Sequence, residues 1–121
     1  MLEKSSLTFV HLNCNNIVSK EATLLKFRKK HGVDIMFLSE TWLNSSKKHA
    51  IPKNEIFFDL QNPKPTYGRI EGGLMGICRI ELKEHIRLLD KSIRNDWIIL
   101  QVEDVILGYC YFNPNCPLEN H

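Results

Sequence analysis

The fold is decided by one stretch of the chain, VDIMFLSETWL, which runs from Val33 to Leu43. Its first part, Val33–Leu38, is a short apolar run that predicts a buried strand. Glu40 follows just after the end of this strand. Because burying an unpaired carboxylate is costly in free energy, Glu40 should lie at the surface, pair with another group or hold a cation.

A strand and a helix come before this stretch. Leu7–Leu12 is rich in β-branched and aromatic residues, which predicts a strand. A helix is expected from Lys20 to about Lys30, with Ser19 as its N-cap and Gly32 as the C′ residue that ends it. Its apolar stripe should comprise Leu24, Leu25, Phe27 and His31. Strand, helix and strand form a βαβ unit, so the two strands should be parallel and joined by a right-handed crossover.

Three polar side chains should meet at the carboxyl ends of these parallel strands. Asn13 and Asn15 follow the first strand, and Glu40 follows the second. Ligands bind at this edge in open α/β sheets, and one carboxylate with neutral oxygen ligands and waters is a common way to hold Mg²⁺. The simpler alternative is that Asn13–Asn16 is a turn and that Glu40 is a surface residue.

The second half of the chain is rich in strand signals and has no clear helix. Trp97–Val102 and Val105–Tyr111 should form a hairpin. Shorter strands are expected at Glu55–Leu60, Gly72–Arg79 and His85–Leu89. We expect mostly antiparallel pairing in this half, which gives an α/β protein with a layered, mixed sheet.

Polar groups also close the last strand, at Tyr111–Asn115. A phenol there could contact a phosphate and Asn113 could orient a water, whereas the simpler alternative is a strand end followed by a proline turn. The pair Gly72-Gly73 lacks the helix and the lysine of a phosphate loop, so it predicts a tight strand entry. His11 alternates with an aromatic residue along its strand and is interpreted as a satisfied core or edge histidine.

The bulk composition narrows the class of protein. The chain has 121 residues, enough for one domain, with a net charge of +2 and 43% hydrophobic residues. No apolar run reaches the length of a membrane span, and the N-terminus has no signal-peptide core. None of the four cysteines forms a Cys-x-x-Cys pair. We therefore expect a reduced intracellular protein of the nucleus or cytoplasm, neither secreted nor bound to a membrane.

Four segments, taken in order, resemble a known group of enzymes. They are HLNCNNI (His11–Ile17), the Val33–Leu43 stretch, GGLMGI (Gly72–Ile77) and LGYCYFNP (Leu107–Pro114). Together they resemble the endonuclease/exonuclease/phosphatase superfamily, the deoxyribonuclease I-like proteins, and most of all the endonuclease domain of non-LTR retrotransposons. The resemblance implies a partial four-layer α/β sandwich (DNase I-like), in which residues 1–121 are the N-terminal part of the domain.

The resemblance also implies roles for several residues. Glu40 matches the metal-binding glutamate, which would hold Mg²⁺ or Mn²⁺. Asn15 falls where many members place an aspartate near the metal, so the site here would carry less negative charge. Asn13 matches the family's asparagine at the sheet edge where the phosphate binds. Asn113 is a second candidate phosphate contact.

A tyrosine that contacts the scissile phosphate is also part of the family pattern. Tyr111 falls on it, although counting back from Pro114 points to Phe112 instead. The later motifs of the family, which position and activate the attacking water, are absent from the chain.

These implications lead to one expected function and two alternatives. We expect a fragment of a metal-dependent endonuclease that cleaves nucleic acid, with DNA as its partner, and that is inactive alone. The alternatives are a degenerate non-catalytic binding module and a phosphatase of the same superfamily. One half of a two-sheet sandwich should also leave the apolar side chains of Trp97–Val102 and Val105–Tyr111 uncovered, which favours association with a missing C-terminal half or with a second copy.

Overall fold

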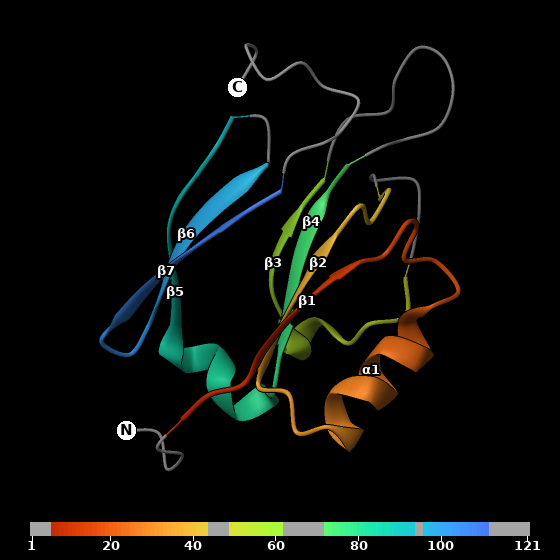
Figure 1. Cartoon of the computed structure of the whole chain (residues 1–121), viewed down its shortest axis with the longest axis horizontal. Coiled ribbons are helices and arrows are strands. Elements are labelled where there is room, and N and C mark those ends of the chain that lie inside the picture. Colours follow the sequence, from red (N-terminus) through yellow and green to blue (C-terminus); the bar gives the residue numbers. More distant parts are fainter. Residues whose placement is uncertain (1–5, 44–48, 62–71, 94–95, 112–121) are drawn as a thin grey trace.

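Two β-sheets lie face to face, and a helix covers the outer face of one of them (Figure 1). This computed structural model describes residues 6–43, 49–61, 72–93 and 96–111. The layers are therefore helix, mixed sheet and antiparallel sheet, which confirms an α/β fold with a mixed sheet.

The first sheet contains the parallel pair that the βαβ unit predicts. Its strand order is β1-β2-β4-β3, formed by Phe9–Asn13, Ile35–Ser39, Leu74–Cys78 and Ile56–Leu60. β1 and β2 are parallel, whereas β4 pairs antiparallel with both β2 and β3. The register places Asn13 beside Ser39. Both parallel strands therefore end at the same edge of the sheet.

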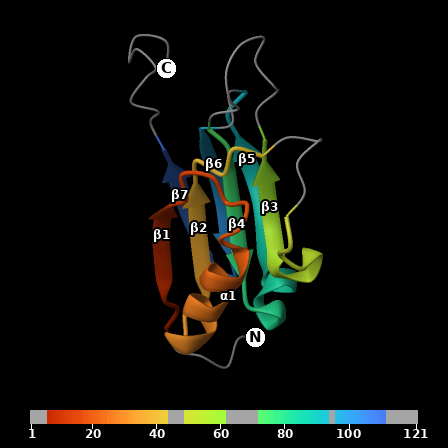
Figure 2. The ribbon, with the colours of Figure 1, turned by 90° about the vertical axis from the view of Figure 1, so that its right-hand side faces the viewer.

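Helix α1 (Glu21–Lys30) covers one face of this sheet (Figure 2) and packs Leu24 into a core with residues of β2 and β4. The expected Ser19 cap is wrong, because Ser19 has a φ of 75° and Lys20 takes the N-cap position without a side-chain cap. The expected stripe is also wrong at Phe27 and His31, which are both exposed, while Arg28 is buried. Gly32 ends the helix with a φ of 61°, as expected.

The second sheet covers the other face of the first. It consists of β5 (Ile86–Lys91), β6 (Trp97–Val102) and β7 (Val105–Cys110), all antiparallel, and the 3-10 helix η2 (Ile80–His85) leads into it. Ile98, Leu100 and Val102 are buried in the core between the sheets. The expectation of uncovered apolar side chains is therefore wrong for the inner face of β6, because the two sheets bury each other, whereas Val105 and Ile106 on β7 are exposed.

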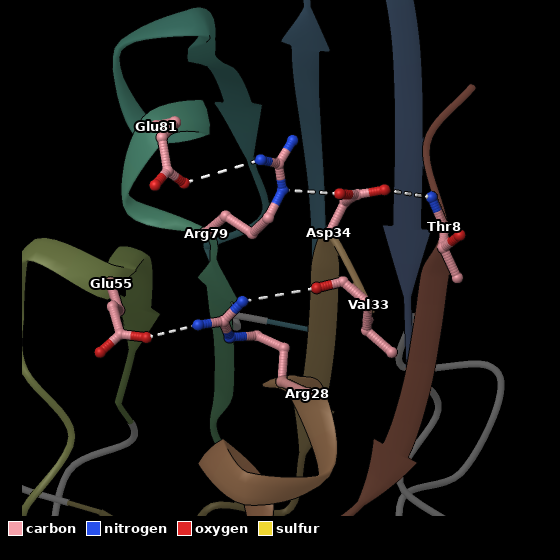
Figure 3. A network of polar contacts seen from close by, with 7 residues as sticks. All are labelled: Thr8, Arg28, Val33, Asp34, Glu55, Arg79 and Glu81. Atoms are coloured by element: carbon pink, nitrogen blue, oxygen red, sulfur yellow. Dashed lines mark hydrogen bonds and ion pairs between the residues drawn. The ribbon is translucent and has the colours of Figure 1, made fainter. Parts of the chain in front are cut away.

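A polar network fixes the end of β2 that lies opposite Glu40 (Figure 3). Arg28 Nη2 lies 2.7 Å from Glu55 Oε1, with both side chains almost fully buried, and Glu55 comes from the 3-10 helix η1 (Lys53–Glu55). The buried Asp34 carboxylate accepts from Arg79 Nε at 2.7 Å and from the Thr8 backbone N–H at 2.7 Å. These bonds tie α1, β2 and the segments beside them together.

Two further observations bear on the expected class of protein. No helix within the described ranges is long and apolar enough to cross a bilayer. Cys14, Cys78 and Cys110 are free thiols, and burial raises the pKa of Cys14 and of Cys78 to about 11. Neither buried thiol can therefore supply a thiolate nucleophile near neutral pH.

Candidate functional site

The chain stays tightly hydrogen-bonded beyond the ends of the two parallel strands. Asn16 N–H donates to the Glu40 carbonyl at 2.9 Å, and Ile17 N–H donates to the Thr41 carbonyl at 3.1 Å. On the other side, Trp42 N–H donates to the Gly72 carbonyl at 3.0 Å. The segment around Glu40 is therefore held from both sides.

This held segment contains a cluster of left-handed backbone conformations. Positive φ angles occur at Asn15 (49°), Asn16 (84°), Glu40 (54°), Trp42 (56°), Gly72 (78°) and Gly73 (95°). Non-glycine residues in this region cost on the order of 1–3 kcal/mol each, and they persist where the surroundings over-determine them. Such strain gathers at functional sites, so the backbone itself marks this edge as a candidate site.

The Glu40 carboxylate is buried without a cationic partner among the described residues. The residue is 8% exposed. Its Oε2 accepts from the Trp42 indole Nε1 at 2.7 Å and from the Gly72 backbone N–H at 3.1 Å. Both donors are neutral, so they stabilise the charge without cancelling it. A single charged carboxylate suits one hard divalent cation that keeps most of its water ligands.

Asn13 and Tyr111 join the two sheets beside this carboxylate. Asn13 Nδ2 donates to the Tyr111 hydroxyl at 3.3 Å, across 98 residues of sequence. The Tyr111 backbone N–H donates to the Asp96 carbonyl at 2.9 Å, which fixes the residue just beyond β7. Burial raises the pKa of Tyr111, and so do the charge of Glu40 and a hydrogen bond with it. The phenol is therefore a protonated donor at neutral pH.

Asn15 is close to this cluster in sequence, but the contacts of its side chain do not include Glu40. It is exposed, and its backbone N–H donates to Asn13 Oδ1 at 3.1 Å, which makes an Asx turn. Lys20 Nζ donates to the carbonyl oxygens of Cys14 and Asn15, at 2.5 and 2.9 Å. The structure therefore places the Lys20 ammonium group against the Asn15 turn. The sequence did not predict this contact. The asparagine turn that the sequence offered as an alternative is also present.

Two of the predicted positions lie outside the described residues. These are Asn113 and Phe112, which was the alternative to Tyr111. Within the described part of the chain, no group of three or more His, Cys, Asp or Glu side chains could hold a metal ion. A metal at this edge would therefore depend on Glu40 as its single described carboxylate.

His11 is occupied by neighbours, as its interpretation as an edge histidine requires. Its Nε2 lies 3.1 Å from Ser39 Oγ, and its ring meets the Tyr109 ring edge-on at 5.3 Å. Tyr109 in turn stacks on Phe37 at 4.6 Å. These contacts give the ring a structural role between the two sheets.

Trp42 and Gly72 are the two contacts of Glu40 that the sequence reasoning missed. The tryptophan stood in the same Val33–Leu43 stretch, and the glycine pair was interpreted only as a strand entry. Gly73 does serve that entry, because a Cβ there would lie 2.3 Å from Thr41 Oγ1. The signal that could have found Gly72 is the pairing of β4 with β2, which brings the start of β4 to the end of β2.

Two comparisons of the sequence with known proteins gave no match. No protein-family model matches the chain, and no curated protein sequence matches it.

Proposed function

We propose that this chain carries the metal- and phosphate-binding side of a phosphodiester-cleaving site of the deoxyribonuclease I-like type, acting on nucleic acid. One observation carries the proposal. Asn13, Glu40 and Tyr111, which the family resemblance singles out, come from three segments and meet at one edge. The hydrogen bond between Asn13 and Tyr111 joins the end of β1 to the residue just beyond β7, so proximity along the chain does not explain it.

The order of the layers also supports the proposed deoxyribonuclease I-like type. A helix, a mixed sheet and a second sheet form three successive layers (Figure 2). We propose that they are three layers of a partial four-layer α/β sandwich, with residues 1–121 as the N-terminal part of the domain.

Each described residue of the site has a role in this proposal. Glu40 would hold one Mg²⁺ or Mn²⁺, whose charge, when it is bound, would stabilise the negative charge that develops on a phosphate. The Asn13 carboxamide and the Tyr111 hydroxyl would donate to phosphate oxygens. Lys20, held on the neighbouring turn, adds positive charge that attracts a nucleic-acid backbone.

A general base for hydrolysis cannot be assigned to the described residues. His11 is engaged with Ser39 and Tyr109, and both buried thiols stay protonated at neutral pH. General acid–base help is worth about a hundredfold to ten-thousandfold in rate. We therefore propose that the chain by itself binds metal and phosphate but does not cleave.

Thermal unfolding of the chain with and without divalent cation tests the proposed metal site. At about ten times the dissociation constant, Mg²⁺ should stabilise the fold by about 1.4 kcal/mol. For a domain of this size the melting temperature should rise by about 5 °C. Glu40→Gln should abolish the rise.

Glu21→Gln is a matched control for that substitution. Glu21 is also 8% exposed and accepts a backbone N–H, from Ala50 at 3.1 Å, but it lies on α1. This variant should keep the full Mg²⁺ shift. A shift that survives in Glu40→Gln would contradict the proposed metal site.

A plasmid-nicking assay with Mg²⁺ tests the second half of the proposal. The chain should show no more nicking than Glu40→Ala. Nicking by the unaltered chain that Glu40→Ala lacks would contradict the proposed inactivity, and it would make His11 the first candidate for the base.

A further inference from the structure

We infer that Trp42 is a positioning residue for Glu40: its indole N–H holds Oε2 and so fixes the orientation of the carboxylate that would bind a divalent cation. The inference rests on the proposed metal-binding role of Glu40 and extends it to a residue that contacts no metal. It starts from the 2.7 Å hydrogen bond between Trp42 Nε1 and Glu40 Oε2. Gly72 N–H donates to the same oxygen at 3.1 Å, and the Tyr111 hydroxyl also hydrogen-bonds with the carboxylate.

The backbone is arranged so that a tryptophan can reach back to the carboxylate. Glu40 and Trp42 both have left-handed conformations, with φ of 54° and 56°. Neither residue type favours this conformation, so the surrounding structure must stabilise it. Trp42 N–H donates to the Gly72 carbonyl at 3.0 Å, and the next residue, Leu43, is fully buried. The backbone is therefore held at Trp42 itself and at the residue that follows it.

The chemistry of the donor makes it suited to preparing a metal ligand. An arginine or lysine at this place would orient the carboxylate but would also neutralise it and compete with the cation. An indole N–H is a neutral donor that cannot accept, so it fixes the carboxylate and leaves the negative charge available. Groups that orient a metal ligand in this way typically change metal affinity by about 10–100-fold when they are removed.

Metal titrations followed by NMR separate positioning from packing. The Gly72 amide reports on Glu40 Oε2 in the unaltered chain and in both tryptophan variants, so its chemical shift gives the Mg²⁺ dissociation constant without reference to activity. Trp42→Phe keeps an aromatic ring but removes the N–H donor together with part of the indole. It should weaken Mg²⁺ binding by about tenfold.

The second tryptophan supplies the matched control. Trp97 lies on β6, 36% exposed, and Trp97→Phe should leave the Mg²⁺ affinity unchanged. In the unaltered chain, the indole N–H resonance of Trp42 should move with Mg²⁺, while that of Trp97 should not. Without metal, Glu40→Gln should also move the Trp42 resonance. These two measurements decide the question even where Trp42→Phe does not fold.

The outcomes separate the two proposals. If the unaltered chain shows no Mg²⁺ binding, the proposed function fails, and the inference fails with it. If it binds Mg²⁺ through Glu40 while Trp42→Phe binds as tightly, only the inference fails. A Trp42 resonance that responds neither to Mg²⁺ nor to Glu40→Gln would overturn the inference as well.

Discussion

Gly73→Ala should destabilise the fold through two separate costs, both of which the structure defines. Gly73 has a φ of 95°, and placing alanine in left-handed backbone costs about 1–2 kcal/mol. The new Cβ would also lie 2.3 Å from Thr41 Oγ1. Thr41 is fully buried and its backbone is held by Ile17 and Gly73, so it cannot move aside cheaply. Overpacking of this kind costs about 1–3 kcal/mol, so we expect a total loss of about 2–5 kcal/mol.

A double-mutant cycle separates the two costs. Thr41→Ala removes Oγ1, a buried hydroxyl that has no hydrogen-bond partner among the described residues. In the double variant the steric overlap is gone and the backbone cost remains. We therefore expect a coupling energy of about 1–3 kcal/mol between the two substitutions, measured by urea unfolding followed by circular dichroism.

Gly32→Ala is the control for the backbone cost alone. Gly32 has a φ of 61°, and a Cβ there would meet nothing within 4 Å. It should cost only about 1–2 kcal/mol. The reasoning is refuted if Gly73→Ala costs no more than Gly32→Ala, or if the Thr41 and Gly73 substitutions are additive.

Two further predictions concern stability away from the site. Arg28→Met should cost about 3–5 kcal/mol because it leaves the buried Glu55 charge without its partner, and adding Glu55→Leu should recover most of the loss in urea unfolding. Burial raises the pKa of Cys14 and Cys78 from 9.0 to about 11, so the thiols contribute stability below pH 9 that is lost as the pH rises towards 11. Each thiol should lower the unfolding free energy by about 1.4 kcal/mol per pH unit in that window, and a slope that Cys78→Ala leaves unchanged would contradict its assignment.

The parallel strands of the first sheet and the edge where they end could be predicted from local sequence patterns. The apolar runs on either side of α1 are strands because their side chains suit a pleated, buried surface, and Gly32 supplies the left-handed residue that ends the helix. A short crossover then requires parallel strands, so Asn13 and Glu40 had to meet at one edge. Topology alone was sufficient for this part of the site.

The remaining contacts depend on how separate elements pack. Arg28 replaced Phe27 on the inner face of α1 because Glu55, far along the chain, neutralises its charge. Helical periodicity records only which residues share a face, so it cannot reveal a buried ion pair with another element.

The βαβ unit, and with it the edge where Asn13 and Glu40 follow their strands, can be derived from local sequence patterns. The groups that complete that edge depend on how distant segments pack together. Tyr111 reaches Asn13 because the second sheet packs on the first, and Trp42 reaches Glu40 through left-handed backbone that its own residue type disfavours. Local propensity cannot predict either contact, because the first depends on the packing of the two sheets and the second on surroundings that hold a locally disfavoured backbone conformation.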